Sequence, residues 1–234
     1  IPLFSYKTIP SQLKIVLAFV LSWMMYYTFS IEAFTINGDY LLLVLKEAVV
    51  GLVLGLVVYI VFSAVQIAGG FIDFQMGFAM ANIVDPQTGA QSPLMGQFFN
   101  FLLLLVFLAI NGHHLVLDGI FYSYQFMPID QFFPKFGDAE SVEYIMKLFV
   151  AVFAIAFQMS APIIATLFLV TLALGITGKT VPQLNIFVVG FPIKIAVGFI
   201  LLIIMMGVMV EVMEKVIEIG IIGMRNLMIV LGGS

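Results

Sequence analysis

Two adjacent histidines and a nearby aspartate have the residue types of a metal site. His113 and His114 are the two histidines of the chain, and Asp118 follows His114 by four residues. At this spacing His114 and Asp118 share one helix face. That face supplies two ligands, whereas zinc usually takes three or four from the protein. We therefore predict no metal here and interpret the cluster as a polar helix start or an interfacial group.

No other catalytic arrangement stands out in the sequence. It contains no nucleophile with a base at a recognisable spacing, no phosphate-binding glycine loop and no evident pair of catalytic carboxylates. The prediction is a protein that is not an enzyme and needs no cofactor. The alternative from the enzyme class is a polytopic membrane enzyme that uses His113, His114 and Asp118.

A stripe of small and polar residues surrounds Asp73. Steps of three, four, three and four residues place its members on one helix face: Ser63, Gln66, Gly70, Asp73 and Gly77. A charge that faces lipid at a helix centre costs roughly 2.5–3.5 kcal/mol, so Asp73 is expected to face protein or water. Two interpretations stay open. The stripe is a tight helix–helix seam, the commoner use of small residues, or a water-facing wall.

Residues 82–93 are predicted to form a loop. Asp85–Pro86 favours a turn, Gly89 permits a positive φ, and Pro93 suits the first position of a helix. Large flexible apolar side chains flank this loop and could seal a gap, namely Met76, Phe78, Met80 and Met95. Polar side chains could set its conformation, namely Asn82, Asp85 and Gln91. We favour a pore-inserted or re-entrant loop over an ordinary aqueous connection.

Composition indicates a membrane protein. Of 234 residues 63% are hydrophobic and 9% are charged, and the mean hydropathy is +1.19, whereas soluble domains carry about a quarter charged residues. The polar segment 69–96 cannot lie against hydrocarbon, because each unpaired backbone group would cost several kcal/mol. Nine scattered basic residues and a net charge of −4 exclude a nucleic-acid footprint. Because the chain begins at Ile1, some N-terminal sequence is expected to precede it.

The apolar segments predict an all-α fold. Pro162 and Pro192 fall inside apolar stretches and should kink or break their helices. The last two helices are therefore expected to be bent or split. Helices are expected over residues 12–30, 41–66, 67–81, 93–111, 113–126, 141–175 and 184–231.

The clearly aqueous stretch, residues 127–144, divides the chain. Asp138 could cap the helix that follows it. Residues 1–130 and 131–234 are expected to form the two halves of one structural unit. The C-terminal half would be a helical hairpin, and its last helix has the charge pattern of one that docks on partners.

The few scattered charges give only a weak indication of how the chain is oriented in the membrane. Lys7, Lys14 and Lys179 fall on one side of an alternating topology, which the positive-inside rule places in the cytoplasm. Other charges within or beside apolar stretches must pair, lie near an interface or face protein and water: Lys46, Glu47, Asp73, Lys147, Lys194 and Glu211. For Lys46, Glu47 and Lys147 the simple marking of a segment end is an equal alternative.

Three motifs together resemble the FliR family of flagellar export-gate proteins and the related T-component of type III secretion systems. They are GGFIDFQMGFAMANIVDPQTGAQSPLMG at 69–96, NGHHLVLDG at 111–119 and TGKTVPQLNIFVVGFPIKI at 177–195. They run in order over nearly the whole chain. Lys179 stands where many relatives carry Arg, which keeps the charge but loses bidentate geometry. The resemblance leads us to expect that the family's first hydrophobic segment precedes Ile1 and is missing from this sequence.

The resemblance implies a place in a helical, pore-forming assembly. Such a chain joins FliP and FliQ subunits: residues 1–130 pack like FliP, the hairpin 131–234 packs like FliQ, and one copy closes the ring. FlhB and FlhA contact the assembly, and many helices are buried against partners. The family's plug loop maps to residues 79–96, inside the pore. Candidates for subunit contacts are Lys179, Pro182, Gln183, Asn185, Lys194 and Glu211.

The leading hypothesis is a non-enzymatic component of the flagellar export channel, in the bacterial inner membrane and the flagellar basal body. It conducts unfolded flagellar proteins, contacts lipid and helps to hold the resting pore shut. The main alternative is an ion-coupled secondary transporter with a midplane site near Asp73. Co-purification with FliP and FliQ as one stable particle would exclude both the transporter and the enzyme.

Overall fold

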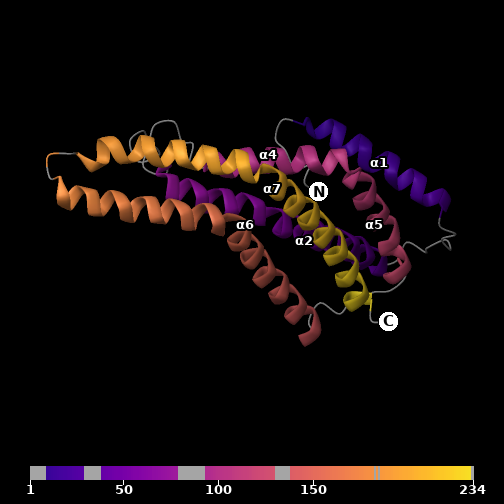
Figure 1. Cartoon of the computed structure of the whole chain (residues 1–234). Helices are drawn as coiled ribbons and strands as arrows, with labels where there is room; N and C mark the ends of the chain where they lie inside the picture. The colour runs from indigo at the N-terminus through magenta and orange to yellow at the C-terminus, as the bar shows by residue number, and fades with distance from the viewer. Residues whose placement is uncertain are drawn as a thin grey trace. The chain divides into compact units, whose positions relative to one another are not determined.

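The computed structural model describes residues 9–28, 38–78, 93–129, 138–181, 183 and 185–232. Over these ranges each regular element is a helix (Figure 1), which confirms the predicted all-α class. The helices are α1 (Ser11–Thr28), α2 (Gly38–Met76), α4 (Leu94–Ala109), α5 (Gly112–Phe126), α6 (Ala139–Thr180) and α7 (Ile186–Gly232).

Helix α2 differs from the prediction, because it is one helix of 39 residues where the sequence suggested two, 41–66 and 67–81. No proline interrupts it, and its adjacent glycines Gly69 and Gly70 are tolerated where the helix packs closely. It ends at Met76 because Gly77 adopts a φ of +93°, a left-handed conformation that commonly terminates helices. Residues 79–81 of the second predicted helix lie outside the described ranges.

The two prolines interrupt neither of the long helices. Helix α6 continues through Pro162 and α7 continues through Pro192, so the split that proline can cause does not occur in either. Each proline removes one backbone hydrogen bond, while the turns on both sides keep theirs. In α6 the Thr166 hydroxyl also donates to the Pro162 carbonyl at 2.8 Å.

Three described helices are long and apolar enough to cross a membrane: those spanning Tyr40–Met76, Ala139–Thr180 and Val188–Gly232. Helices α4 and α5 together form a fourth candidate, a pair broken next to Asn111, whose φ is 57°. At about 1.5 Å per residue, α2, α6 and α7 are roughly 58–70 Å long. A bilayer core is about 30 Å thick, so each of these helices has more residues than one straight crossing requires.

The chain forms two compact units, and α2, α6 and α7 contribute to both. The first unit comprises Ile1–Val61, Asn111–Phe149 and Glu218–Ser234. In it α7 lies close to α6 and α5: the Tyr144 hydroxyl donates to the Gly223 carbonyl at 3.1 Å, and a Cβ on Gly119 would meet the Met224 methyl group. Helix α1 has no buried residue.

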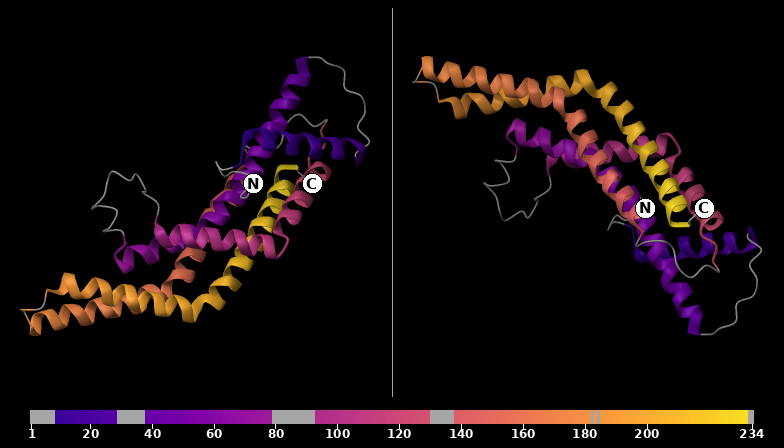
Figure 2. Two further views of the ribbon diagram at one scale, coloured as in Figure 1. Left: turned by 90° about the horizontal axis from the view of Figure 1, so that it is seen from above. Right: turned by 90° about the horizontal axis from the view of Figure 1, so that it is seen from below.

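The second unit comprises Phe62–Ile110 and Val150–Ile217. Its halves of α6 and α7 run side by side as a hairpin (Figure 2). The two helices are in close contact. A Cβ added to Gly190 of α7 would lie 3.3 Å from the Leu174 Cδ1 atom of α6. The predicted division of the chain near residue 130 stays a prediction.

Candidate functional site

The first turn of α4 lies directly against α2 in the second unit. A Cβ on Gly69 would be 2.5 Å from the Gly96 Cα atom and 2.6 Å from its nitrogen. A Cβ on Gly96 would in turn be 3.0 Å from the Gln66 carbonyl oxygen. The two helix backbones therefore touch without side chains between them, as at the small-residue interfaces of membrane helices.

Asp73 supplies the hydrogen-bond acceptor that the start of α4 lacks. The N-cap position is Pro93, which makes no side-chain cap bond. Instead, the Met95 backbone N–H donates to the Asp73 Oδ2 atom at 2.9 Å. Asp73 is 3% exposed. A carboxylate at a helix N-terminus satisfies an otherwise unpaired donor and interacts favourably with the helix dipole.

The second oxygen of the same carboxylate is unused within the described ranges. Asp73 Oδ1 is buried there without a hydrogen-bond partner. A buried acceptor without a partner is destabilising. The junction of α2 and α4 therefore holds a buried carboxylate of which one oxygen is engaged and the other has no partner among these residues.

The residues at the end of α2 pack on α7, also within the second unit. A Cβ on Gly198 would be 2.7 Å from the Met76 Cε atom, and one on Gly77 would be 2.5 Å from the Phe191 Cε1 atom. The rings of Phe78 and Phe199 lie with their centroids 6.4 Å apart. The chain is thus held on α7 just before residue 79 and on α2 just after residue 92.

Comparison with known proteins identifies the family. The model of the bacterial export proteins, family 1, matches residues 1–219. The chain belongs to this family. Three relatives illustrate its range. The flagellar biosynthetic protein FliR of Bacillus subtilis is 54% identical over 235 residues, which cover 100% of the chain and 91% of that protein.

More distant relatives come from flagellar and from other secretion systems. FliR of Escherichia coli is 28% identical over 205 residues, covering 86% of the chain and 76% of that protein. The Yop proteins translocation protein T of Yersinia pestis is 32% identical over 174 residues, covering 74% and 65%. The resemblance drawn from the three motifs is confirmed. This family-1 export protein is a membrane component of a bacterial type III protein-export apparatus.

The structure brings several residues of the predicted polar stripe of this export protein to the α2–α4 junction. Gln66 and Asp73 contact the first turn of α4, and a Cβ on Gly70 would be 3.5 Å from the Pro93 Cγ atom. These residues therefore take part in a close contact between α2 and α4, and the choice between a seam and a water-facing wall for the stripe as a whole stays a prediction. The sequence did not reveal that Gly69 and Gly96 face each other; the Gly69–Gly70 pair was the signal that could have suggested it.

The loop residues of the prediction fall into two groups. The flanking residues Met76, Gly77, Phe78, Pro93 and Met95 are described, and both flanks are packed on neighbouring helices. The others lie outside the described ranges: Met80, Asn82, Asp85, Pro86, Gly89 and Gln91.

The predicted contact residues of the export protein lie mostly on its surface. Lys179, Gln183, Asn185 and Glu211 are exposed, and Lys194 is half-buried. The Asn185 carbonyl accepts the Val188 and Val189 N–H groups at 3.1 and 3.2 Å and so starts α7. Pro182 lies outside the described ranges. Their role in subunit contacts stays a prediction.

The histidine cluster has no metal-site geometry within the described ranges. The rings of His113 and His114 lie with centroids 4.2 Å apart. His114 and Asp118 are exposed, whereas the Nδ1 atom of His113 is buried without a described partner. No group of three His, Cys, Asp or Glu side chains gathers there, or elsewhere in the described residues.

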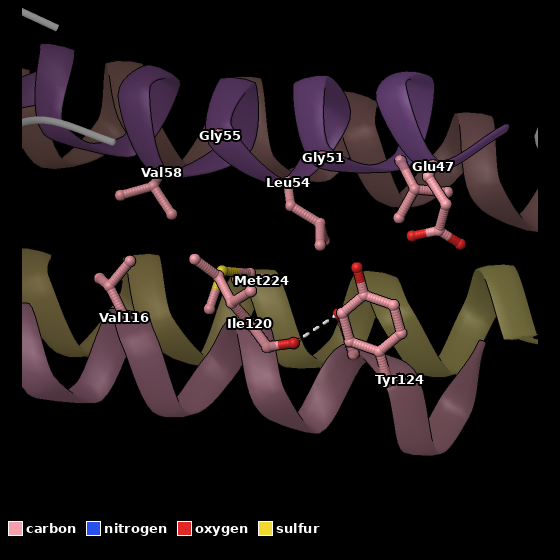
Figure 3. Close-up of a pocket in the computed structure, with 11 residues that line it drawn as sticks. Glu47, Gly51, Leu54, Gly55, Val58, Val116, Ile120, Tyr124 and Met224 are labelled. Atoms are coloured by element: carbon pink, nitrogen blue, oxygen red, sulfur yellow. Dashed lines mark hydrogen bonds between the residues drawn. The ribbon is translucent and has the colours of Figure 1, made fainter. Parts of the chain in front are cut away.

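A largely apolar cavity of about 160 Å³ lies in the first unit, between α2, α5 and α7 (Figure 3). Glu47 and Tyr124 face each other at one end of it. Beside this end the Lys46 Nζ atom pairs with Glu47 Oε1 at 2.7 Å and donates to the Pro128 carbonyl at 3.0 Å. Lys46 thus has partners, although it is 5% exposed within a long apolar helix.

Proposed function

We propose that the chain is a core component of the flagellar type III protein-export gate. In the bacterial inner membrane and flagellar basal body it forms, with FliP and FliQ subunits, the pore that conducts unfolded substrates. FlhB and FlhA contact this assembly. Residues 79–96 help to keep the resting pore closed. Residues 1–130 pack like a FliP subunit and the hairpin 131–234 packs like a FliQ subunit.

One observation carries this proposal. A polar segment that the sequence predicts to be irregular interrupts an apolar chain, and the residues at both of its ends are packed on neighbouring helices. Irregular backbone at membrane depth is tolerated where it is buried in protein or lines an aqueous cavity. Flanks that are packed on α7 and α2 support this role, because the helices at both ends could keep their positions while the segment between them closes or opens a passage.

The test is removal of residues 82–92 in cells that carry the variant in place of the natural chain. We expect the complex with FliP and FliQ to assemble, and ion leak through it to rise, because the segment no longer fills the pore. A control variant replaces residues 82–92 with Gly and Ser at equal length, to separate the effect of length from that of the side chains. An ion conductance unchanged by the deletion would count against the plug role.

Partners and location have their own test. The chain should co-purify with FliP and FliQ as one stable particle from the inner membrane. A chain that purifies alone from these membranes would contradict the assembly, whatever the deletion variant shows.

A buried carboxylate with one oxygen that has no partner among the described residues favours one alternative function, an ion-coupled transporter with its site near Asp73. Reconstitution of the isolated chain in vesicles tests it. Uptake driven by an ion gradient and lost in Asp73→Asn would support a transporter, and the export proposal expects no such uptake.

A further inference from the structure

The start of α4 depends on a side chain from another helix, and this dependence carries an inference beyond the gate itself. We propose that Asp73 is a positioning residue that keeps the first turn of α4 docked on α2 at every stage of export. The inference rests on the proposed export function. It means that any opening of the pore leaves the α2–α4 junction closed.

The hydrogen-bond pattern supports a permanent junction. Pro93 makes no side-chain cap bond, and the Met95 N–H has the Asp73 Oδ2 atom as its acceptor at 2.9 Å. Separation of the helices would break the hydrogen bond between this N–H and the Asp73 carboxyl group. Asp73 is 3% exposed, and a buried polar group without a partner is much more costly than the same group in water.

Packing supports the same conclusion. The backbones at Gly69 and Gly96 are so close that a single added Cβ would overlap with main-chain atoms. One turn further along their own helices, Ile72 of α2 and Phe99 of α4 are fully buried, at 0% exposure. Opening the junction would separate the two backbones and would also part the Met95 N–H from the Asp73 carboxylate.

A disulfide can lock the junction and so test the proposal directly. A Cβ on Gly70 would lie 4.0 Å from the Pro93 Cβ atom, and disulfides need a Cβ separation of about 3.5–4.5 Å. The chain contains no Cys, so the two introduced thiols are its only ones. The double variant Gly70→Cys, Pro93→Cys is oxidised in the assembled complex with copper–phenanthroline, and free thiols are counted with a maleimide mass tag.

We expect the disulfide to form and export of flagellar subunits to continue at the rate of the reduced variant. The single variants Gly70→Cys and Pro93→Cys control for the substitutions themselves. Loss of export on oxidation, with recovery on reduction, would overturn the proposal, because the junction would then have to open. Absence of the disulfide in a fully assembled particle would overturn it as well.

Substitutions of Asp73 separate positioning from simple structural support. In the double-cysteine background Asp73→Ala should slow disulfide formation by about tenfold or more, as expected for the loss of a hydrogen bond to a charged group. Asp73→Asn should restore it, since the amide oxygen can accept the Met95 N–H. Equal rates of disulfide formation in the double-cysteine chains with Asp73, Asp73→Ala and Asp73→Asn would contradict the positioning role of Asp73. The thiol measurement depends on neither export nor ion conductance. Its result therefore stays valid even if the deletion of residues 82–92 shows that this segment is not a plug.

Discussion

Single glycines show at the residue scale how closely this chain is packed. Gly69 and Gly70 are neighbours on α2, yet they face different surroundings. An added Cβ would overlap with the backbone at Gly96 in the first case and would make ordinary contact with the ring of Pro93 in the second. Local sequence does not distinguish the two, so the difference arises from the position of α4.

Alanine substitution at these two glycines should therefore have opposite consequences. We expect Gly69→Ala to destabilise the assembled complex by about 1–3 kcal/mol, the usual cost of overpacking. Gly70→Ala should be tolerated. Thermal unfolding of the purified complex in detergent measures both, and equal melting temperatures for the two variants would contradict the close backbone contact.

Lys46 provides a second test at this scale. Its Nζ atom is bound by Glu47 and the Pro128 carbonyl, and its side chain is 4% exposed. Removing it in Lys46→Ala takes a buried ammonium group away from two half-buried partners, which should cost about 1–3 kcal/mol.

The matched control for Lys46 is Lys147, which pairs with Glu143 at the same 2.7 Å but is 72% exposed. Lys147→Ala should leave the melting temperature unchanged, because exposed pairs contribute little. A larger effect at Lys147 than at Lys46 would show that burial does not decide the contribution of these charges.

At the element scale, the sequence predicted the helices because long apolar runs leave a membrane chain few other ways to satisfy its backbone. The sequence also predicted a break between two helices near residue 66, whereas α2 is continuous there. It could not predict that Asp73 accepts from Met95, because the two are 22 residues apart and nothing local links them. The polar stripe around Asp73 was visible, but its neighbour was not.

The position at which α2 ends can be tested by comparing Gly77, which directly follows the helix, with a glycine inside it. Gly77 has a φ of +93°, and a Cβ on it would overlap with Phe191. Gly77→Ala should destabilise by about 1–2 kcal/mol or more, from the left-handed conformation alone.

Gly51 is the control, because a Cβ there would meet nothing within 4 Å. Gly51→Ala should be neutral or stabilising by up to about 1 kcal/mol, from helix propensity. Chemical denaturation of the purified chain in detergent compares the two. Stabilisation by both substitutions would mean that α2 does not end at Gly77.

For the whole molecule, the two ends of α6 carry opposite charge signs. Glu140 lies in its first turn and Lys179 in its last. Composition was sufficient to predict a membrane protein, whereas the cytoplasmic location of Lys7, Lys14 and Lys179 under the positive-inside rule stays a prediction. Neither composition nor this rule could predict the two compact units, which combine residues from distant segments of the chain.

Orientation can be measured by labelling the chain in intact cells and in inverted membrane vesicles, since its sequence has no Cys. A single Cys in place of Thr180 should react with a membrane-impermeant maleimide from the cytoplasmic side, because positively charged ends are retained there. A Cys in place of Ala139 should react from the opposite side. The reverse pattern would show that the few lysines do not set the orientation.

The interleaved first unit has a consequence for biosynthesis. Its residues come from the beginning, the middle and the end of the chain, up to Glu218–Ser234. Translation delivers roughly 5–20 residues per second from the N-terminus, so this unit lacks the last part of α7 until all the segments before residue 218 have been made. Until then the groups that α7 covers, such as the Tyr144 hydroxyl that donates to Gly223, need another partner. Until residues 218–232 emerge these groups are uncovered, so an insertion factor or an already assembled subunit would be suited to cover them.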